Sequence, residues 1–423
     1  MLRMGRIVTV VSGAFFFLVF IISWIFGAGA EISTAADTTV TLTETRKLIP
    51  SSSIPADDFG VTLVLSGDLA VVGAPGQAMG GNTPGVVHIF GRDTGGPVQW
   101  GEAVTLTAGD GVNGDSFGVL PAYSAGALAV GAPFATVNGN TAQGAVYLFA
   151  RGSRLDSWTF VRKITAVPGS SGDGFGIAAL DNGRLLVGAP NVTVGSNPRQ
   201  GAAYLFEQDA GGPDNWGQTV VLTASDGVSN DYFGDSVVLS GDTAVVNQYI
   251  FSRQLNGNWT ETTKLAAADG LESVLFGHSA AMSGDIVALG DASAEVNGQA
   301  FQGAVYLYGR HQNGANQWGQ IRKITVTSGL AGDSFGTGVA LSGDMLVVGA
   351  PGADKAYVFR QNAGGENMWG LTAVLTGSDV TDGSEFGIGT AVDRGLILVG
   401  ARTANAVYLF DLRSYLYLPF IRQ

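Results

Sequence analysis

The chain has 423 residues, of which 64 are glycine, 13 are proline and none is cysteine, and its formal net charge is −13. Only 13% of the residues are charged, against roughly 25% in an average soluble protein, while 46% are apolar, which allows a large core and excludes intrinsic disorder. The absence of cysteine excludes disulfides, cysteine-ligated zinc, iron–sulfur clusters and thiol nucleophiles. Three histidines leave little material for histidine-based catalysis, and the acidic balance argues against nucleic acid as a partner.

Residues 1–30 are predicted to be a targeting segment. Arg3 and Arg6 precede a long apolar run, which ends in the small-residue cleavage motif Ala28-Gly29-Ala30. Because the run is long enough to cross a bilayer, a cleaved signal peptide and an uncleaved signal anchor are alternatives, with a buried core helix as a third. The first two place the rest of the chain, beginning with a linker at 31–38, outside the cytoplasmic membrane. We therefore expect an extracellular or cell-envelope protein, anchored to the membrane only if this segment is not cleaved.

The rest of the chain consists of seven repeats. Phe-Gly recurs at intervals of 58, 58, 58, 43, 59 and 51 residues. The dipeptides, to which we assign a structural role, are Phe59-Gly60, Phe117-Gly118, Phe175-Gly176, Phe233-Gly234, Phe276-Gly277, Phe335-Gly336 and Phe386-Gly387. Gly-Ala-Pro or a remnant of it follows each Phe by 14 residues, or 13 in the third repeat, and an aromatic segment comes next. Six of the seven Trp residues stand 17 residues before the next Phe-Gly.

Each repeat is predicted to form four short strands, A to D. Strand A begins at Phe-Gly and alternates bulky and small residues, as at residues 335–341. A tight turn such as Ser342-Gly343-Asp344 leads to strand B, a continuous apolar run covered on both faces. Strand C is the aromatic segment, and strand D follows the Trp, as at residues 320–325. Seven such units predict an all-β fold, a seven-bladed β-propeller with four strands per blade.

The two ends of the repeat region predict how the ring closes. The last repeat has strands A, B and C but stops at Phe410 with no Trp and no strand D. Residues 41–49 supply a lone strand D ahead of the first Phe-Gly. We therefore expect this N-terminal strand to complete the last blade of a propeller that spans residues 39–411. The apolar tail at 412–423 is too short to span a membrane, and it either packs on the propeller or serves for envelope attachment or sorting.

Phe-Gly followed by Gly-Ala-Pro resembles the signature of FG-GAP repeat proteins. Residues 39–411 as a whole are similar to the integrin α-subunit-type propeller, in its bacterial version with short turns. The integrin-type calcium loop, D-x-D-x-D-G, lies between strands A and B, where this chain has only Ser-Gly-Asp, as at residues 66–68, or an equivalent turn. One carboxylate cannot supply the six to eight oxygens that calcium needs, so we predict no metal site there and no cofactor. Calcium binding by the crossover acids stays open.

Candidate binding residues lie in the segments that join the strands. The B–C loops vary in length while the A–B turns do not, and the B–C loops share one face with the acidic D–A crossovers. Variable loops on a rigid scaffold usually carry binding, and the resemblance to integrins implies this same face. The candidate ligand-binding residues are Asp110, Asp115, Asp226, Asp231 and Asp333. The alternative role of such carboxylates is to cap turns through hydrogen bonds to the backbone.

Three further sets have a structural interpretation with a functional alternative. The constant register of the Trp residues indicates packing at the outer rim of the blades rather than a carbohydrate platform. His278 either lines the central channel or is satisfied within the fold, and His88 takes the place of a strand C tyrosine and is structural.

These observations favour a noncatalytic function. We predict an exported, monomeric propeller for cell-surface adhesion or recognition of a protein or a glycan, through the face that carries the B–C loops and D–A crossovers. A structural component of the envelope is the second hypothesis. A hydrolase or lyase is the third, since an enzyme needs acids, bases or a metal that break the repeat symmetry, whereas the acids here mostly follow it.

Overall fold

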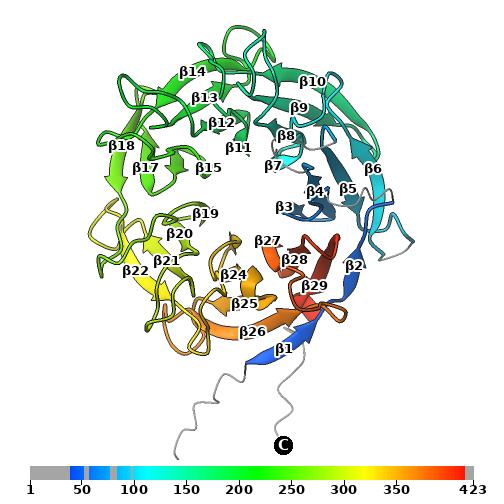
Figure 1. Ribbon diagram of the computed structural model, residues 1–423, viewed down its shortest axis with the longest axis vertical. Helices are drawn as coiled ribbons and strands as arrows, with labels where there is room; N and C mark the ends of the chain where they lie inside the picture. Colours follow the sequence, from blue (N-terminus) through cyan, green and yellow to red (C-terminus); the bar gives the residue numbers. More distant parts are fainter. Residues whose placement is uncertain (1–38, 52–56, 77–82, 97–98, 415–423) are drawn as a thin grey trace, which may run out of the picture. The chain divides into compact units, whose positions relative to one another are not determined.

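The computed structural model describes residues 39–51, 57–76, 83–96 and 99–414. The predicted targeting segment, the linker at 31–38 and residues 415–423 of the tail lie outside the described residues. Residues 39–414 form seven sheets that follow one another around a central opening (Figure 1). The helical elements of this part of the chain are two short 3-10 helices, η1 (Pro351–Ala353) and η2 (Leu412–Ser414). None of the described segments is a helix with the length and apolar character required to cross a membrane.

Six blades are built from four consecutive antiparallel strands, with strand A innermost and strand D at the rim (Figure 1). Blade 1 contains β3 (Thr62–Ser66), β4 (Leu69–Ala74), β5 (Val86–Gly91) and β6 (Gly101–Leu106). Blade 2 contains β7 (Val119–Ser124), β8 (Ala127–Ala132), β9 (Ala145–Arg151) and β10 (Trp158–Ile164). Blade 3 contains β11 (Ile177–Asp181), β12 (Arg184–Ala189), β13 (Ala202–Glu207) and β14 (Gly217–Leu222). Blade 4 contains β15 (Val237–Ser240), β16 (Thr243–Val246), β17 (Tyr249–Arg253) and β18 (Trp259–Lys264). Blade 5 contains β19 (Ser279–Ser283), β20 (Ile286–Asp291), β21 (Ala304–Gly309) and β22 (Gly319–Ile324). Blade 6 contains β23 (Val339–Ser342), β24 (Met345–Ala350), β25 (Lys355–Arg360) and β26 (Gly370–Thr376). The predicted all-β, seven-bladed propeller is confirmed.

The beginning of the chain closes the seventh blade, as predicted. Its own strands are β27 (Phe386–Asp393), β28 (Leu396–Ala401) and β29 (Ala406–Asp411). They are joined by β2 (Arg46–Leu48), which pairs antiparallel with β29 and sets Lys47 opposite Tyr408. The structure adds a strand that the prediction did not include, because β1 (Val40–Thr43) pairs in parallel with β26 and gives blade 6 a fifth strand. The N-terminal segment therefore bonds to both blades at the 6/7 boundary.

Strand A begins later than predicted in six of the seven blades, since only β27 includes its Phe-Gly. At Gly336 a φ of +101° lies in the left-handed region and interrupts the extended backbone, whereas the equivalent Gly387, with a φ of +104°, lies within β27, whose ladder is irregular between Phe386 and Thr390. β23 accordingly begins at Val339, and the predicted alternation of bulky and small residues from Phe335 onward is wrong for its first residues. The Phe-Gly dipeptide is instead the end of the D–A crossover.

The repeated Phe and Gly residues build the contacts between blades. Phe175 is completely buried, and its ring meets those of Tyr204 and Phe206 edge-on, with centroids 5.6 and 5.9 Å apart. A Cβ atom at Gly188, in the Gly-Ala-Pro of blade 3, would stand 1.8 Å from the carbonyl oxygen of Gly234 in blade 4. Glycine at this position therefore allows the backbones of adjacent blades to touch.

The core consists of apolar clusters between blades. Strand B is buried along its whole length in β4, β24 and β28, which confirms that this strand is covered on both faces. Each of the seven clusters joins two neighbouring blades, and the one at the 7/1 boundary includes Leu48 of the closing strand. Burial of apolar surface is thus distributed evenly around the ring and holds each blade to the next.

Candidate functional site

One face of the ring, which we call the B–C/D–A face, carries the B–C loops and the D–A crossovers. The long loops at residues 133–144, 190–201 and 292–303 each lie along the crossover that leads into the next blade. In blade 3, three crossover N–H groups, at positions 230, 232 and 233, donate to successive loop carbonyls at 2.9 to 3.1 Å. The side-chain amide of Asn197 adds a hydrogen bond to the carbonyl oxygen of Gly227 at 3.2 Å. The loop is therefore bonded to the crossover as an additional extended segment.

Three of the predicted ligand-binding carboxylates cap turns in the crossovers. Asp115, Asp231 and Asp333 each stand two residues before a repeat Phe and accept a hydrogen bond from the backbone N–H three residues earlier, at 2.9, 2.7 and 2.8 Å. The donating residue is aliphatic in each turn, and its side chain is 58 to 66% exposed: Val112, Val228 and Leu330. These contacts are those of the turn-capping alternative. Ligand binding by the three carboxylates stays a prediction. Within the crossover, each carboxylate closes a turn in which the donating aliphatic residue is exposed to solvent.

The other two predicted carboxylates, Asp110 and Asp226, fasten their crossovers to the next blade. Asp226 accepts hydrogen bonds from Lys264 Nζ and from the Tyr249 hydroxyl, both at 2.7 Å, and the ammonium lies 5.0 Å from the centroid of the tyrosine ring. The bonds from Lys264 and Tyr249 hold the pKa of the Asp226 carboxyl below its ordinary value. Burial, reinforced by the nearby carboxylate, raises the pKa of Tyr249 to about 12. The cluster is thus a stable ion pair over an aromatic ring.

The same cluster recurs at four crossovers, although it was not predicted from the sequence. Its members are Asp110, Tyr147 and Lys163; Asp226, Tyr249 and Lys264; Asp269, Tyr306 and Lys323; and Asp379, Tyr408 and Lys47. The Asp stands seven residues before a repeat Phe, and the Lys precedes the last apolar residue of strand D. The other three repeats lack both the Asp and the Lys at these positions. The Asp and the Lys are thus either both present or both absent in each of the seven repeats. This correlation is the sequence signal that identifies the cluster.

The five predicted carboxylates are not brought together in one site. Asp110 and Asp115 lie in the crossover into blade 2, Asp226 and Asp231 in the crossover into blade 4, and Asp333 in the crossover into blade 6. Across the described part of the chain, no three His, Asp or Glu side chains are grouped so that they could hold a metal ion. Any ligand that these carboxylates share would have to cover several blades.

The boundary between blades 4 and 5 differs from the others on this face. The two-residue turn Asn247-Gln248 joins β16 to β17, so no B–C loop covers the crossover at residues 265–278. A pocket of about 280 Å³ lies here, bordered by Gln248, Glu272 and Val274 among others. Val274 takes the position of the turn-capping aspartates and is 87% exposed. We call this pocket the blade 4/5 gap.

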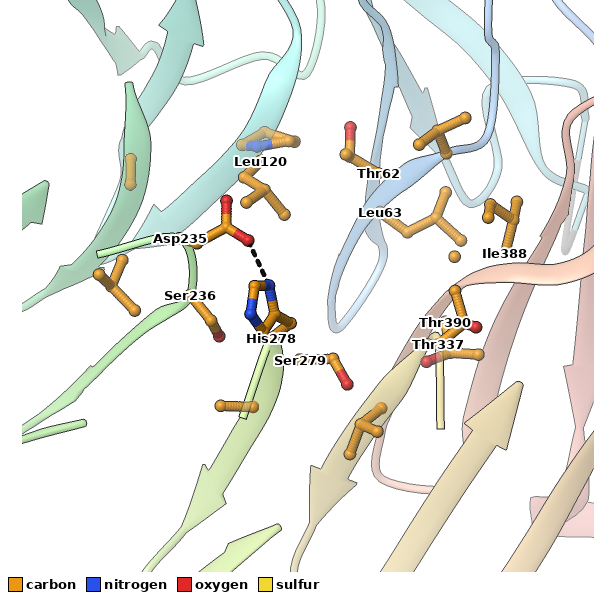
Figure 2. Close-up of a pocket in the computed structure, with 18 residues that line it drawn as sticks. Thr62, Leu63, Leu120, Asp235, Ser236, His278, Ser279, Thr337, Ile388 and Thr390 are labelled. Carbon is orange, nitrogen blue, oxygen red and sulfur yellow. Dashed lines mark hydrogen bonds and ion pairs between the residues drawn. The ribbon is translucent and has the colours of Figure 1, made fainter. Parts of the chain in front are cut away.

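The same two blades also differ at the central channel. The residue after Phe-Gly is apolar in blades 1, 2, 3 and 7, but it is Asp235 in blade 4 and His278 in blade 5. Figure 2 shows the two side chains pointing toward each other, with His278 Nδ1 2.6 Å from Asp235 Oδ2, in a pocket of about 290 Å³. The hydroxyl of Ser279 donates to the carbonyl oxygen of Gly336 at 2.6 Å, so it is engaged away from the imidazole. His278 therefore lines the channel, and it also borders the blade 4/5 gap.

The tryptophans and His88 have structural surroundings. Five of the six tryptophans in register are less than a tenth exposed: Trp100, Trp216, Trp259, Trp318 and Trp369. His88 is completely buried, with its ring edge-on to that of Phe59 at 5.2 Å and Nδ1 2.8 Å from Glu102 Oε1. Both observations agree with the structural interpretation of these residues.

The opposite face, which we call the A–B/C–D face, is formed by the short turns. Several turn aspartates form ion pairs with arginines, at 3.0, 2.6 and 2.9 Å: Asp242 with Arg184, Asp285 with Arg310, and Asp344 with Arg360. A pocket of about 510 Å³ lies between blades 4 and 5 and is bordered by Arg253, Arg310 and Trp318. The Arg310 guanidinium in this pocket is already bonded to Asp285 and to the Thr243 hydroxyl.

A family model for the FG-GAP repeat matches six segments that together cover more than half of the chain: residues 42–90, 100–149, 158–206, 216–257, 259–308 and 318–364. The chain belongs to the FG-GAP repeat family. A search of curated protein sequences gave no significant match.

The matched segments explain why this FG-GAP propeller closes with its N-terminal strand. The first segment begins at Leu42 in β1 and ends at Phe90 in β5, so the family unit runs from strand D of one blade to strand C of the next. A chain built from such units begins with a strand D and ends with a strand C, which leaves one blade to be completed from both ends. The seventh unit, near residues 369–410, is not matched, although it forms a blade like the others.

Solved structures similar to the FG-GAP propeller include other propellers of low sequence identity. The WD40 repeats of RRP9 align with a TM-score of 0.53 at 10% identity, covering 86% of this chain and 99% of that one. U3-55K gives 0.53 at 10% identity, with 88% and 100% covered. The hydrazine synthase of Kuenenia stuttgartiensis gives 0.52 at 12% identity, with 86% and 99% covered. At such identities the similarity concerns the fold alone.

Proposed function

We propose that the protein is an exported, noncatalytic recognition protein, which binds a partner at the cell surface through the B–C/D–A face. Export rests on the predicted targeting segment at residues 1–30. The fold supplies a rigid ring whose B–C loops on this face range from a two-residue turn to long docked loops, which is the arrangement of a scaffold that carries binding loops.

The observation that carries the proposal is the distribution of exposed apolar side chains. Among the described residues, nine large apolar side chains on the B–C/D–A face are at least 37% exposed: Ile49, Val112, Val167, Val228, Leu271, Val274, Leu275, Phe301 and Leu330. The A–B/C–D face has two, Leu255 and Met368. The unequal distribution of exposed apolar side chains favours this face as the interaction surface, because apolar surface is costly to leave in water.

The chemistry of this face favours a protein over a glycan. The exposed residues are aliphatic apart from Phe301, and five of the six tryptophans in register, which could stack on a sugar ring, are buried. Aliphatic contacts surrounded by polar turns are typical of the centre and rim of a protein interface. A glycan remains an outcome of the experiment below, as does a purely structural component of the envelope.

The test uses purified protein and a panel of immobilised matrix proteins, envelope fractions and glycans. The variant Val228→Ser/Leu330→Ser removes two exposed side chains from the B–C/D–A face, and we expect it to weaken binding at least about tenfold with unchanged melting temperature. The matched control is Leu255→Ser/Met368→Ser on the opposite face, which should bind as the unmodified protein does.

Three results would overturn the proposal in different ways. Equal loss in both double variants would show that the face is not specific. Binding to glycans alone, unaffected by Val228→Ser/Leu330→Ser, would replace the protein partner with a sugar. Absence of binding to the whole panel, together with ordered assembly on the cell surface, would favour the structural role.

A further inference from the structure

We propose that the blade 4/5 gap binds an extended peptide segment of a partner protein, which takes the place of the missing B–C loop. This inference rests on the proposed recognition function and specifies the chemistry of the partner. The segment should carry a glutamine followed by glycine, since that pair ends the loops that lie over the equivalent crossovers.

The loops of blades 2, 3 and 5 show how such a segment is held. They end in Gln143-Gly144, Gln200-Gly201 and Gln302-Gly303, and the three glutamines are at most 4% exposed. The Gln143 side-chain amide donates to the carbonyl oxygen of Ala166 at 3.4 Å, and that of Gln302 donates to the carbonyl oxygen of Val326 at 2.7 Å. Ala166 and Val326 both stand nine residues before a repeat Phe. In blades 2 and 5 the glutamine is thus a buried anchor that donates to an equivalent carbonyl oxygen.

The uncovered crossover retains this acceptor position. Ala267 stands nine residues before Phe276 and is 6% exposed. Its carbonyl oxygen accepts the N–H of Gly270 at 2.9 Å, the same turn that Val326 makes with Gly329 at 3.0 Å. The position of the carbonyl acceptor and its turn are therefore retained at the 4/5 boundary, where no B–C loop lies over the crossover.

The crossover is also held in place without a loop. In the covered crossovers, the N–H three residues before the repeat Phe donates to a loop carbonyl oxygen. The N–H of Ser273, at the same position here, donates instead to the buried carboxylate of Asp291 at 3.0 Å. Asp291 replaces the alanine of Gly-Ala-Pro in this repeat alone. The N–H of Phe276 donates to the carbonyl oxygen of Ser273 at 3.2 Å. Because these bonds come from blade 5 itself, the gap is formed before any partner binds, which lowers the entropic cost of binding.

The size and rim of the gap favour a peptide over a free small molecule. Its volume of about 280 Å³ lies at or below the lower end of the range for small-molecule pockets, roughly 300 to 1,000 Å³. The crossover beside it exposes Leu271, Val274 and Leu275 by 61, 87 and 37%. A peptide buries an anchor in the gap and lays its neighbouring residues on this apolar rim, as extended peptides do when main-chain bonds and side-chain pockets act together.

The test uses a labelled, C-terminally amidated peptide with the sequence of residues 293–303, titrated into the purified protein. We expect saturable binding, and at least about tenfold weaker binding when the peptide carries Gln302→Glu, because the amide donor is lost. In a loop-graft variant, residues 188–203 replace Asn247-Gln248 and cover the crossover. This variant should lose peptide binding and melt no lower than the unmodified protein.

Matched controls separate the gap from the rest of the molecule. The same residues inserted at Asn256-Gly257, on the A–B/C–D face, should leave peptide binding unchanged. If the loop-graft variant does not fold, Val274→Asp restores the aspartate of the other crossovers and should weaken peptide binding, while Leu255→Asp on the A–B/C–D face should not.

Four results would overturn the inference. These are failure of the peptide to bind, equal binding to the loop-graft variant, a dimer of the unmodified protein that the graft abolishes, and a glycan that competes for the gap. The dimer would make a second copy of the chain the occupant. Peptide results are independent of the partner panel, so failure here leaves the recognition function standing if Val228→Ser/Leu330→Ser still weakens partner binding.

Discussion

The two faces of the ring use the same four strands per blade but expose different chemistry. On the A–B/C–D face, A–B turns of nearly constant length carry carboxylates that pair with arginines, such as Asp344 with Arg360. On the B–C/D–A face, the connections range from a two-residue turn to long docked loops, and aliphatic side chains such as Val228 and Leu330 are exposed. One face can therefore keep its A–B turns constant while the other varies widely in the length of its B–C loops and in its exposed apolar surface.

The largest expected effect comes from breaking the closure on which both faces depend. Deletion of residues 39–50 removes β1 and β2, exposes strand edges on blades 6 and 7 and takes Leu48 from the 7/1 cluster. We expect a loss of about 4 kcal/mol or more in the free energy of unfolding, or aggregation, because an open ring leaves strands unpaired. Thermal unfolding and light scattering measure this effect. Truncation immediately before Thr39 is the control, and a deletion variant as stable as that control would disprove closure by the N-terminal strand.

A smaller effect should follow from separating a loop from its crossover on the B–C/D–A face. Gly201 has a φ of +87°, and a Cβ there would stand 2.1 Å from the carbonyl oxygen of Phe233. Gly201→Ala should cost about 2 to 4 kcal/mol, since both the backbone conformation and the contact are lost. Gly195→Ala in the same loop is the control, because its φ is +60° and no atom lies within 4 Å of the added Cβ. Chemical denaturation compares the two, and equal costs would contradict the docked loop.

The fold could be predicted to this depth because a closed ring requires a strict repeat. Phe-Gly, Gly-Ala-Pro and the tryptophans recur where blades touch, and the absence of strand D from the last repeat identified the closing strand. The pairing of β1 with β26 could not be predicted, since its position depends on where β2 is held rather than on its own four residues. The start of β23 was misplaced because the left-handed backbone of Gly336 has no signature in side-chain alternation.

The candidate site was only partly predictable, for a related reason. The interval of 43 residues between Phe233 and Phe276 indicates a shortened fourth repeat, which contains the turn Asn247-Gln248. The pocket beside this turn depends on how the next crossover folds, which the interval does not reveal. Asp110 and Asp226 were grouped with the turn-capping aspartates because both kinds lie in acidic crossovers. Their partners, such as Lys264, lie on a strand of the next blade, so a motif considered within one crossover does not reveal the pair.

Acid should weaken the ring through the Asp–Tyr–Lys clusters of the B–C/D–A face. The lysine partners hold the pKa values of Asp226, Asp269 and Asp379 below the ordinary value of about 3.9. A carboxyl with a lowered pKa in the folded state stabilises the protein above its unfolded pKa, and this stability is lost as pH falls through the folded pKa. We therefore expect the clusters to leave the melting temperature unchanged between pH 7 and pH 5. Below about pH 4 their stabilising effect is lost, and the melting temperature should fall.

The double variant Asp226→Asn/Lys264→Met isolates one cluster. On acidification this double variant should lose less free energy of unfolding than the unmodified protein does. We expect the difference between the two proteins to be below about 1 kcal/mol, because the carboxylate is largely exposed and screened. Melting curves between pH 2.5 and 7 measure the difference. Identical pH profiles for the two proteins would show that the cluster does not contribute.

The smallest effect is expected on the A–B/C–D face, where Arg360 Nη1 bonds to both carboxylate oxygens of Asp344 at 2.9 and 3.1 Å. Because the Asp344 side chain is 58% exposed, Arg360→Gln should change the free energy of unfolding by no more than about 1 kcal/mol. Partner binding should be unchanged, whereas Leu330→Ser on the other face should change binding and leave stability as it is. A double-mutant cycle with Asp344→Asn measures the coupling within the pair. A reduction of partner binding by Arg360→Gln would mean that recognition extends over both faces, and the assignment of binding to the B–C/D–A face would then be wrong.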